Sequence, residues 1–253
     1  MAENVQAGHY AQKQIFSRSA LIAWSHRSRF LLARQIVRPY AGRRLLDYGC
    51  GDGTFLAQVA DLFPTAVGAD IDPRQNQDCR ERFAKHREIT FRLIDDLEYP
   101  EHGGAYDVVT CMEVLEHCVP DRTEKVIADL RHLVARDGIA LISVPIEIGP
   151  TLIGKYILRM MAAWRHLGDY NFNEIYTPVE LATMVFAGER TSIPREVHLG
   201  NDGKPSYVHK GFNWRALRRR LQDTFEVRQT RFSPMEFLRG YASSQAWFVC
   251  SPR

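Results

Sequence analysis

Short apolar runs alternate with longer amphipathic stretches between residues 45 and 143. The short runs end in Gly or Asp, whereas the longer stretches have the spacing of helices that cover a sheet. This alternation predicts an α/β fold, in which a parallel sheet carries helices on both faces. The predicted strands occupy residues 44–48, 66–70, 89–94, 106–111 and 139–144. The predicted helices occupy residues 54–62, 73–87 and 122–134, and the last of them ends at Asp137-Gly138.

Two further apolar runs near the end of the chain are strand candidates. They span residues 225–230 and 246–250, and a predicted helix over residues 214–223 precedes them. We expect the two runs to pair as an antiparallel edge, which brings the predicted sheet to seven strands.

Two regions do not follow the alternation. Residues 1–44 are basic, and their apolar positions suit a helical cover over the sheet, although an anionic-substrate surface is the alternative. Residues 150–210 are too long for an ordinary loop, so we expect an inserted α-rich cap that roofs a ligand site. The core then spans residues 45–149, and residues 211–253 add a C-terminal helix and the last strands of the core.

The composition is that of an ordinary soluble domain. Among the 253 residues, 45% are hydrophobic and 25% are charged, which excludes disordered, collagen-like and cysteine-scaffold classes. A net charge of +3 is too small to indicate a polyanion partner, so nucleic acid is not expected. The five cysteines include no Cys-x-x-Cys pair, and neither a secretory signal nor a transmembrane segment of about 18 apolar residues is found. We therefore expect a cytoplasmic protein.

Three glycines at alternating positions follow the first strand, in the run Asp-Tyr-Gly-Cys-Gly-Asp-Gly over residues 47–53. They let the backbone pass close to a ligand. A dinucleotide-binding fold would place its third glycine at residue 54, but here it is Gly53, which disfavours a nicotinamide oxidoreductase. With the acid two residues before the first glycine, the pattern resembles motif I of the class I S-adenosylmethionine-dependent methyltransferases. The resemblance extends through Ser143 and is to the Rossmann-like domain of ubiquinone-pathway methyltransferases.

The resemblance implies S-adenosylmethionine as cofactor, with S-adenosylhomocysteine as product. Asp70 would accept hydrogen bonds from both ribose hydroxyls, because a carboxylate offers two acceptors to a vicinal diol, and Ile71 would lie against the adenine. Asp95 or Asp96 would receive the adenine amino group, and this choice stays open. Each acid taken alone could instead cap a turn or helix. The other implied cofactor residues are Asp47, Gly49, Cys50, Gly51, Leu97, Met112 and Glu113.

A Glu-x-x-Glu-His segment follows the fourth strand, with Glu113, Glu116 and His117 at positions that share one face of a helix. We favour His117 as the catalytic residue, acting as a general base or an orienting group. The alternative is that two carboxylates and an imidazole hold a divalent cation that acidifies a hydroxyl substrate. A purely structural role is the third interpretation.

The cation alternative has a basis in resemblance. Ubiquinone-pathway O-methyltransferases and small-RNA 2′-O-methyltransferases use such a segment for a cation, and the latter add a later histidine. The comparable stretch here has Tyr170 and Asn171 where that histidine would stand, which disfavours RNA as substrate. Because many methyltransferases with Val-Leu-Glu-His bind no metal, a divalent cation is possible but not favoured, and no metal ligand is assigned.

The expected function is methyl transfer from S-adenosylmethionine to an O or N atom of a small-molecule or glycan-type acceptor. The alternatives are a metal-assisted O-methyltransferase of a catechol-like or ribose diol, and a non-catalytic protein that binds the cofactor. The sequence predicts neither the acceptor nor the oligomeric state. Candidates for acceptor contacts lie in or beside the cap region, at His198, Tyr207, His209 and Trp214.

Overall fold

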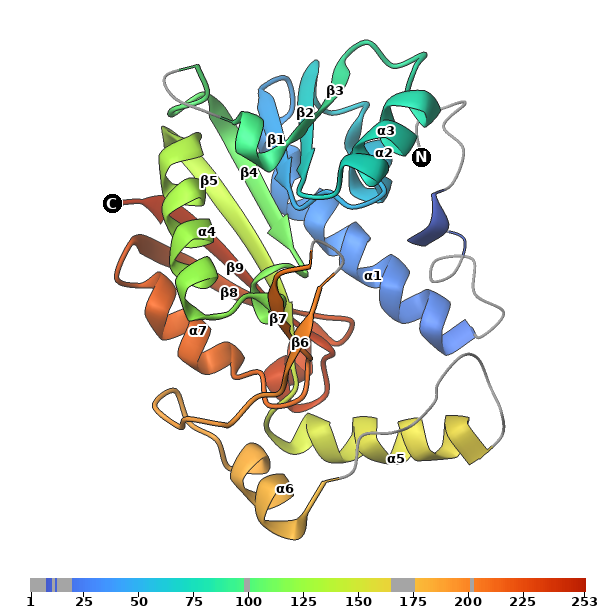
Figure 1. Cartoon of the computed structure of the whole chain (residues 1–253), viewed down its shortest axis with the longest axis vertical. Coiled ribbons are helices and arrows are strands. Elements are labelled where there is room, and N and C mark those ends of the chain that lie inside the picture. The colour runs from blue at the N-terminus through green and yellow to red at the C-terminus, as the bar shows by residue number, and fades with distance from the viewer. Residues whose placement is uncertain (1–7, 11, 13–19, 98–100, 165–175, 201–202) are drawn as a thin grey trace.

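The structure is a computed structural model that describes residues 8–10, 12, 20–97, 101–164, 176–200 and 203–253. A seven-stranded sheet forms its centre, as predicted, with helices on both faces (Figure 1). The strands of this sheet are β1 (Arg44–Tyr48), β2 (Thr65–Asp70), β3 (Ile89–Leu93), β4 (Tyr106–Met112), β5 (Val134–Pro145), β8 (Phe225–Ser233) and β9 (Gln245–Pro252).

The helices come from every part of the chain. The α-helices are α1 (Ala20–Val37), α2 (Thr54–Val59), α3 (Pro73–Arg82), α4 (Pro120–Leu133), α5 (Pro150–Trp164), α6 (Pro178–Val185) and α7 (Trp214–Leu221). The short 3₁₀ helices are η2 (Arg38–Tyr40), η3 (Ile94–Asp96), η4 (Leu115–His117) and η5 (Glu236–Tyr241). A two-stranded hairpin is formed by β6 (Val197–Leu199) and β7 (Pro205–Tyr207). Among the helices that the structure describes, none is long and apolar enough to cross a membrane.

The strand order is β3-β2-β1-β4-β5-β9-β8. The strands from β3 to β5 run parallel, whereas β9 pairs antiparallel with both β5 and β8, which confirms the predicted antiparallel edge. The order reverses between β1 and β4, because the chain first proceeds from β1 toward β3 and then returns to the other side of β1. In such sheets ligands bind outside the carboxyl ends of the strands at this switch point.

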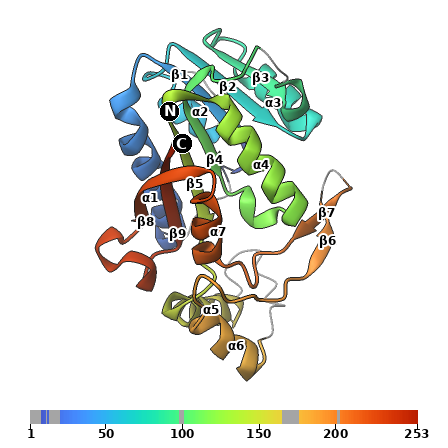
Figure 2. The ribbon, with the colours of Figure 1, turned by 90° about the vertical axis from the view of Figure 1, so that its left-hand side faces the viewer.

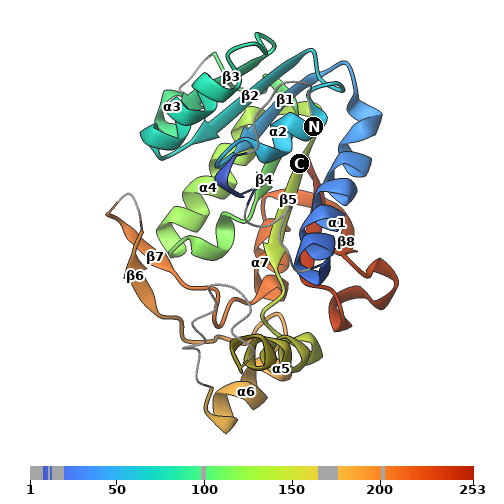
Figure 3. The same ribbon diagram turned by 90° about the vertical axis from the view of Figure 1, so that its right-hand side faces the viewer.

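Apolar side chains fill two layers, one on each face of the sheet. On one face, Phe30 of α1 and Phe55 of α2 are buried in a cluster with Leu45 of β1. On the other, Leu130 of α4 and Leu217 of α7 are buried in a second cluster. Figures 2 and 3 show α4 and α7 on one side of the sheet and α1 on the other. The predicted helical cover is therefore present on both faces of the sheet.

The fifth strand differs from its prediction. The sequence places a helix end at Asp137-Gly138, but β5 already begins at Val134 and runs through these residues. Val134 pairs with Tyr106 and Ile139 pairs with Val108, so the register shifts between the two pairs and the turn residues form an irregularity inside the strand. Gly138 is required there because a Cβ would lie 2.6 Å from the backbone oxygen of Asp107.

Residues 150–210 contain structure of their own, as expected from their length. They carry α5, α6 and the β6–β7 hairpin. Figure 1 shows these elements beyond the carboxyl ends of β4 and β5, on the side of the sheet where a ligand would bind. That they act as a cap over the acceptor stays a prediction.

Candidate functional site

The glycine loop after β1 has a backbone that other residues rarely adopt. Gly49, Gly51 and Gly53 have φ values of 78°, 52° and 69°, all in the left-handed region. The N–H of Gly49 donates to the carbonyl of Ala69 at the end of β2 (2.7 Å). A Cβ on Gly49 would lie 2.3 Å from Cγ2 of Val114. The loop therefore packs directly against the segment that follows β4.

A cavity of about 920 Å³ opens beside this loop, at the switch point of the sheet. Its volume lies within the range of cofactor and small-molecule sites. Of the predicted cofactor residues, its wall includes Asp47, Gly49, Cys50, Gly51, Met112 and Glu113. The N-terminal region and α3 supply other parts of the wall, among them Tyr10, Arg29, Gln75 and Asp78.

Asp70 lies at the end of β2 next to the cavity but is not part of its wall. One carboxylate oxygen accepts from the N–H of Gly51 (2.9 Å), and the other accepts from the N–H of Asp72 (3.0 Å). The carboxylate is thus anchored to the glycine loop. Ile71 follows it and is 42% exposed, which leaves an apolar surface beside the loop.

The residues predicted to meet adenine lie at η3, after β3. Asp95 and Asp96 are both exposed, and Asp96 accepts a hydrogen bond from the N–H of Leu93 (3.3 Å). Leu97 is buried in the core. None of these residues is in the cavity wall, so their predicted contacts with adenine stay predictions.

Asp47 is buried at the end of β1, where one oxygen accepts from the hydroxyl of Thr110 (2.6 Å). Burial raises the pKa of this carboxyl to about 7, because the charged form loses its hydration, while the hydrogen bond from Thr110 opposes the shift. The cavity wall therefore carries a carboxyl whose pKa lies close to neutral pH.

Glu113 links the cavity to the residues beyond it, and its backbone is unusual. The predicted helical face is wrong, because Glu113 has φ 60° and only Leu115–His117 form a helical turn. Left-handed backbone is costly for a glutamate and is often found at functional sites. Oε2 of Glu113 lies 3.4 Å from Nη1 of Arg29 and accepts from Nε2 of Gln245 (3.1 Å). Its Oε1 is buried and accepts no hydrogen bond from the described residues.

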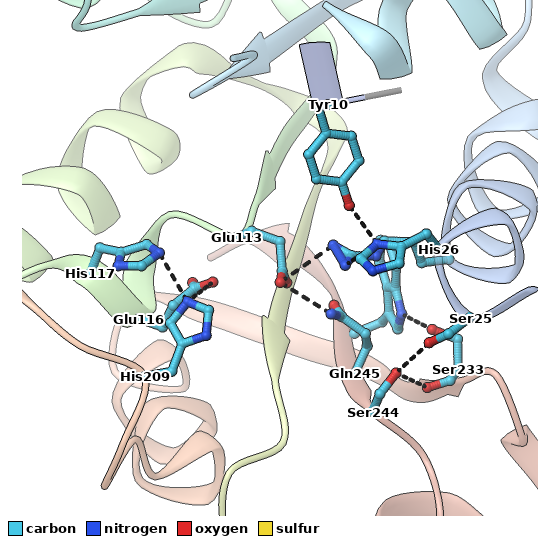
Figure 4. Close-up of polar contacts among 12 residues, drawn as sticks. Tyr10, Ser25, His26, Glu113, Glu116, His117, His209, Ser233, Ser244 and Gln245 are labelled. Atoms are coloured by element: carbon cyan, nitrogen blue, oxygen red, sulfur yellow. Dashed lines mark hydrogen bonds and ion pairs between the residues drawn. The ribbon is translucent and has the colours of Figure 1, made fainter. Parts of the chain in front are cut away.

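Glu116, His117 and His209 form a compact cluster on the other side of Glu113 (Figure 4). Nε2 of His117 and Nε2 of His209 are 3.0 Å apart, and Nε2 of His209 is 4.0 Å from Oε1 of Glu116. Glu116 is fully buried, and neither of its carboxylate oxygens accepts a hydrogen bond within the described part of the chain. Such a group needs a proton or a cation, because burying an unpaired charge is expensive.

The protonation of the two imidazoles follows from their partners. Nδ1 of His117 lies 3.1 Å from the carbonyl oxygen of Tyr207, which can only accept, so this nitrogen carries the proton and Nε2 presents a lone pair. Burial lowers the pKa of His117 and of His209, and the neighbouring His117 lowers the pKa of His209 further. Burial raises the pKa of Glu116, and Glu113 adds to the shift. The cluster thus offers neutral imidazole nitrogens toward a buried carboxyl.

This donor set fits the divalent cation that the resemblance implies. The three donor atoms lie within 4.8 Å of one another. Ligand atoms about 2.0–2.3 Å from a metal lie roughly 3–4 Å apart, and a mixed nitrogen and oxygen set suits several divalent metals. The Tyr207 carbonyl supplies the usual outer hydrogen bond that fixes a ligating imidazole. Tyr170 and Asn171, where the sequence suggested that a histidine was lacking, lie outside the described residues.

Comparison with known proteins fits this geometry. A family model described as a methyltransferase domain matches residues 16–186, which is more than half of the chain. The chain belongs to the methyltransferase domain family. The predicted membership in the class I S-adenosylmethionine-dependent methyltransferases is confirmed, and S-adenosylmethionine is accordingly the cofactor.

A curated relative agrees with this assignment, and two solved structures agree with the fold. A ubiquinone biosynthesis O-methyltransferase of Thiobacillus denitrificans is 30% identical over 153 residues, which cover 58% of this chain and 63% of that relative. The match therefore spans less than two thirds of that relative's length. Two solved structures share the fold. The PH0226 protein of Pyrococcus horikoshii OT3 has a TM-score of 0.61 and 14% identity, covering 98% of this chain and 100% of that one. Magnesium protoporphyrin IX methyltransferase of Synechocystis PCC 6803, solved with bound SAH, has a TM-score of 0.53 and 16% identity. The match covers 93% of this chain and 88% of that one.

Several site residues carry no motif that sequence reasoning detects. Tyr10 and Arg29 line the cavity from the N-terminal region, and His26 contacts both of them. The sequence predicts that region as a helical cover or, alternatively, as an anionic-substrate surface. His209 meets His117 across 92 positions of sequence. Its only signal was its place among the candidate acceptor residues. Gln245 begins β9 and reaches Glu113 because β9 pairs with β5.

Proposed function

We propose that this methyltransferase transfers a methyl group to a hydroxyl oxygen of a small-molecule acceptor, of the catechol or vicinal-diol class, beside a divalent cation. Glu116, His117 and His209 would hold the cation. The observation that carries the proposal is the fully buried, unbonded carboxylate of Glu116 close to two neutral imidazole nitrogens. Proteins rarely bury such a group without a partner.

The cofactor would occupy the cavity beside the glycine loop. Gly49 and Gly51 allow close approach of the backbone, and Asp70 would receive the ribose hydroxyls. Arg29, which is only 9% exposed, presents a guanidinium to the cavity wall and suits the carboxylate of the cofactor's amino-acid end. The methyl group would then point toward the segment from Glu113 to His117.

The chain contributes mainly by positioning. Methyl transfer from a sulfonium is an in-line displacement, so most of the rate gain comes from holding the two reactants in contact. A bound divalent cation would lower the pKa of the acceptor hydroxyl and orient it. Tyr207 holds the ring of His117 through its carbonyl oxygen, and the predicted cap would exclude water from the sulfonium.

The general-base role of His117 is the second candidate. Its Nε2 carries a lone pair, which suits proton removal from an O or N acceptor without a cation. Against this role, burial lowers the pKa of His117 and makes it a weaker base. The similarity to a ubiquinone biosynthesis O-methyltransferase supports oxygen rather than nitrogen as the acceptor atom.

Metal removal separates the two candidates. We would measure methyl transfer from labelled S-adenosylmethionine to paired acceptors, a catechol and its single-hydroxyl counterpart, before and after exhaustive chelation. The proposal predicts that chelation abolishes transfer to the catechol and that Mg²⁺, Mn²⁺ or Zn²⁺ restores it. Full activity in the metal-free protein would contradict the cation and favour His117 as base. Tight cofactor binding without transfer to any acceptor would indicate a non-catalytic protein.

A further inference from the structure

Arg29 contacts two residues of the N-terminal region, His26 and Tyr10, in addition to Glu113. Its Nη2 donates to Nδ1 of His26 (2.8 Å), and the hydroxyl of Tyr10 lies 2.7 Å from the same nitrogen. Because arginine can only donate, Nδ1 of His26 is an acceptor, and the Tyr10 hydroxyl donates to it. The guanidinium also lies 5.8 Å from the centre of the Tyr10 ring. These contacts hold Arg29 in place independently of Glu113.

Glu113 lies between Gln245 and the cluster of Glu116, His117 and His209 (Figure 4), and it also contacts Arg29. Its Oε2 is held by Arg29 and Gln245, whereas its Oε1 is buried and has no hydrogen-bond partner among the described residues. Its charge acts on Glu116, on His117 and on His209. Yet its oxygens lie outside the group of donors that meet within 4.8 Å. Glu113 therefore lies beside the cation cluster, but its carboxylate contacts Arg29, which lines the cofactor cavity.

We propose that Glu113 couples the two ligands of the site: it pairs with Arg29 while the cavity lacks cofactor, and turns toward the cation when the cofactor's carboxylate takes Arg29. This inference rests on the proposed function, because it needs both the cofactor carboxylate at Arg29 and the cation at Glu116, His117 and His209. It adds that each ligand strengthens the binding of the other.

The pairing of charges explains why each ligand would strengthen the binding of the other. Cofactor bound alone takes Arg29 and leaves Glu113 without its counter-charge, whereas a cation that takes Glu113 before the cofactor binds leaves the buried Arg29 without its own. With both ligands present, the cofactor carboxylate faces Arg29 and Glu113 faces the cation, so Arg29 and Glu113 each keep a counter-charge. The free energy needed to separate Arg29 from Glu113 opposes only the first ligand that binds. This is positive coupling between two binding sites. Coupling of this kind is reciprocal and typically amounts to roughly 5-fold to 150-fold in affinity.

The test measures the affinity of the 253-residue chain for Mn²⁺. Electron paramagnetic resonance detects the Mn²⁺ that stays free in solution. We expect saturating S-adenosylhomocysteine to raise the Mn²⁺ affinity by at least about fivefold. 5′-Methylthioadenosine, which lacks the amino-acid end, should leave it unchanged. Glu113→Gln should abolish the difference between the two nucleosides, whereas Gln245→Leu, which keeps the charge of Glu113, should retain it.

The possible results separate this inference from the proposed function. Mn²⁺ binding that both nucleosides raise equally, or that neither changes, would overturn the coupling and leave the cation site intact. Coupling that survives in Glu113→Gln would also overturn it. Absence of Mn²⁺ binding under every condition would overturn the cation site itself, and the coupling with it.

Discussion

Replacing Gly49 by alanine should disrupt the contact between the glycine loop and the segment after β4. Two separate effects oppose the substitution. The φ of 78° costs an alanine about 1–2 kcal/mol relative to ordinary backbone. The new Cβ would also lie 2.3 Å from Cγ2 of Val114, and overpacking of this kind costs about 1–3 kcal/mol. The expected loss in free energy of unfolding is therefore about 2–5 kcal/mol.

Gly42 provides a matched control for the backbone effect alone. Its φ is 83°, and a Cβ there would meet no atom within 4 Å. Gly42→Ala should therefore lose only about 1–2 kcal/mol in urea unfolding. The difference between the two variants isolates the clash with Val114.

Val114→Ala should relieve that clash. Once Cγ1 and Cγ2 are gone, the nearest atom of residue 114 would be Cβ, at 3.6 Å from the new methyl group of Gly49→Ala. In the Val114→Ala background, Gly49→Ala should then cost no more than Gly42→Ala does, and the double-mutant cycle should give a coupling of about 1–3 kcal/mol. Equal losses for Gly49→Ala and Gly42→Ala in the wild-type background would show that Val114 does not clash with the new methyl group.

Three further predictions concern the ligands and the buried acid. Asp70→Asn should weaken S-adenosylhomocysteine binding in calorimetry by about tenfold or more, because a charged hydrogen-bond acceptor is lost; unchanged binding would contradict the assignment. His209→Ala should weaken Mn²⁺ binding by at least about tenfold, whereas His198→Ala, an exposed histidine of the same hairpin region, should not; equal losses would count against the cluster. The pKa of Asp47 is raised to about 7, so the folded state favours the neutral carboxyl. Ionising this carboxyl therefore lowers the free energy of unfolding. The loss is absent below about pH 4, grows as the pH rises, and is complete above about pH 7. Asp47→Asn should thus gain on the wild type by roughly 4 kcal/mol in unfolding free energy between pH 4 and pH 8, and a constant difference would show that Asp47 is not the cause.

Local patterns were enough to predict the sheet. Each strand of the parallel core is a short apolar run with its own turn signal, and the glycine loop is contiguous in sequence, so no distant residue is needed to recognise either. The start of β5 was missed for the opposite reason. Asp137-Gly138 read locally as a turn, but pairing of Val134 with Tyr106 draws these residues into the strand.

The site was predictable only where its residues are neighbours in sequence. Glu116 and His117 belong to one motif, so their chemistry was visible. The left-handed backbone of Glu113 was not visible, because glutamate rarely adopts it and its residue type gives no signal of it. Arg29 and His209 come from regions without motifs, and only the three-dimensional fold brings them to Glu113 and His117.

A crystal structure of the protein with S-adenosylhomocysteine and Mn²⁺, recorded for anomalous scattering, would test the proposed cation site directly. We predict one strong peak about 2.0–2.3 Å from Glu116 and from Nε2 of His117 and His209, with the nucleoside beside Gly51 and Asp70. A nucleoside bound there with no anomalous density between the two imidazoles would contradict the cation site.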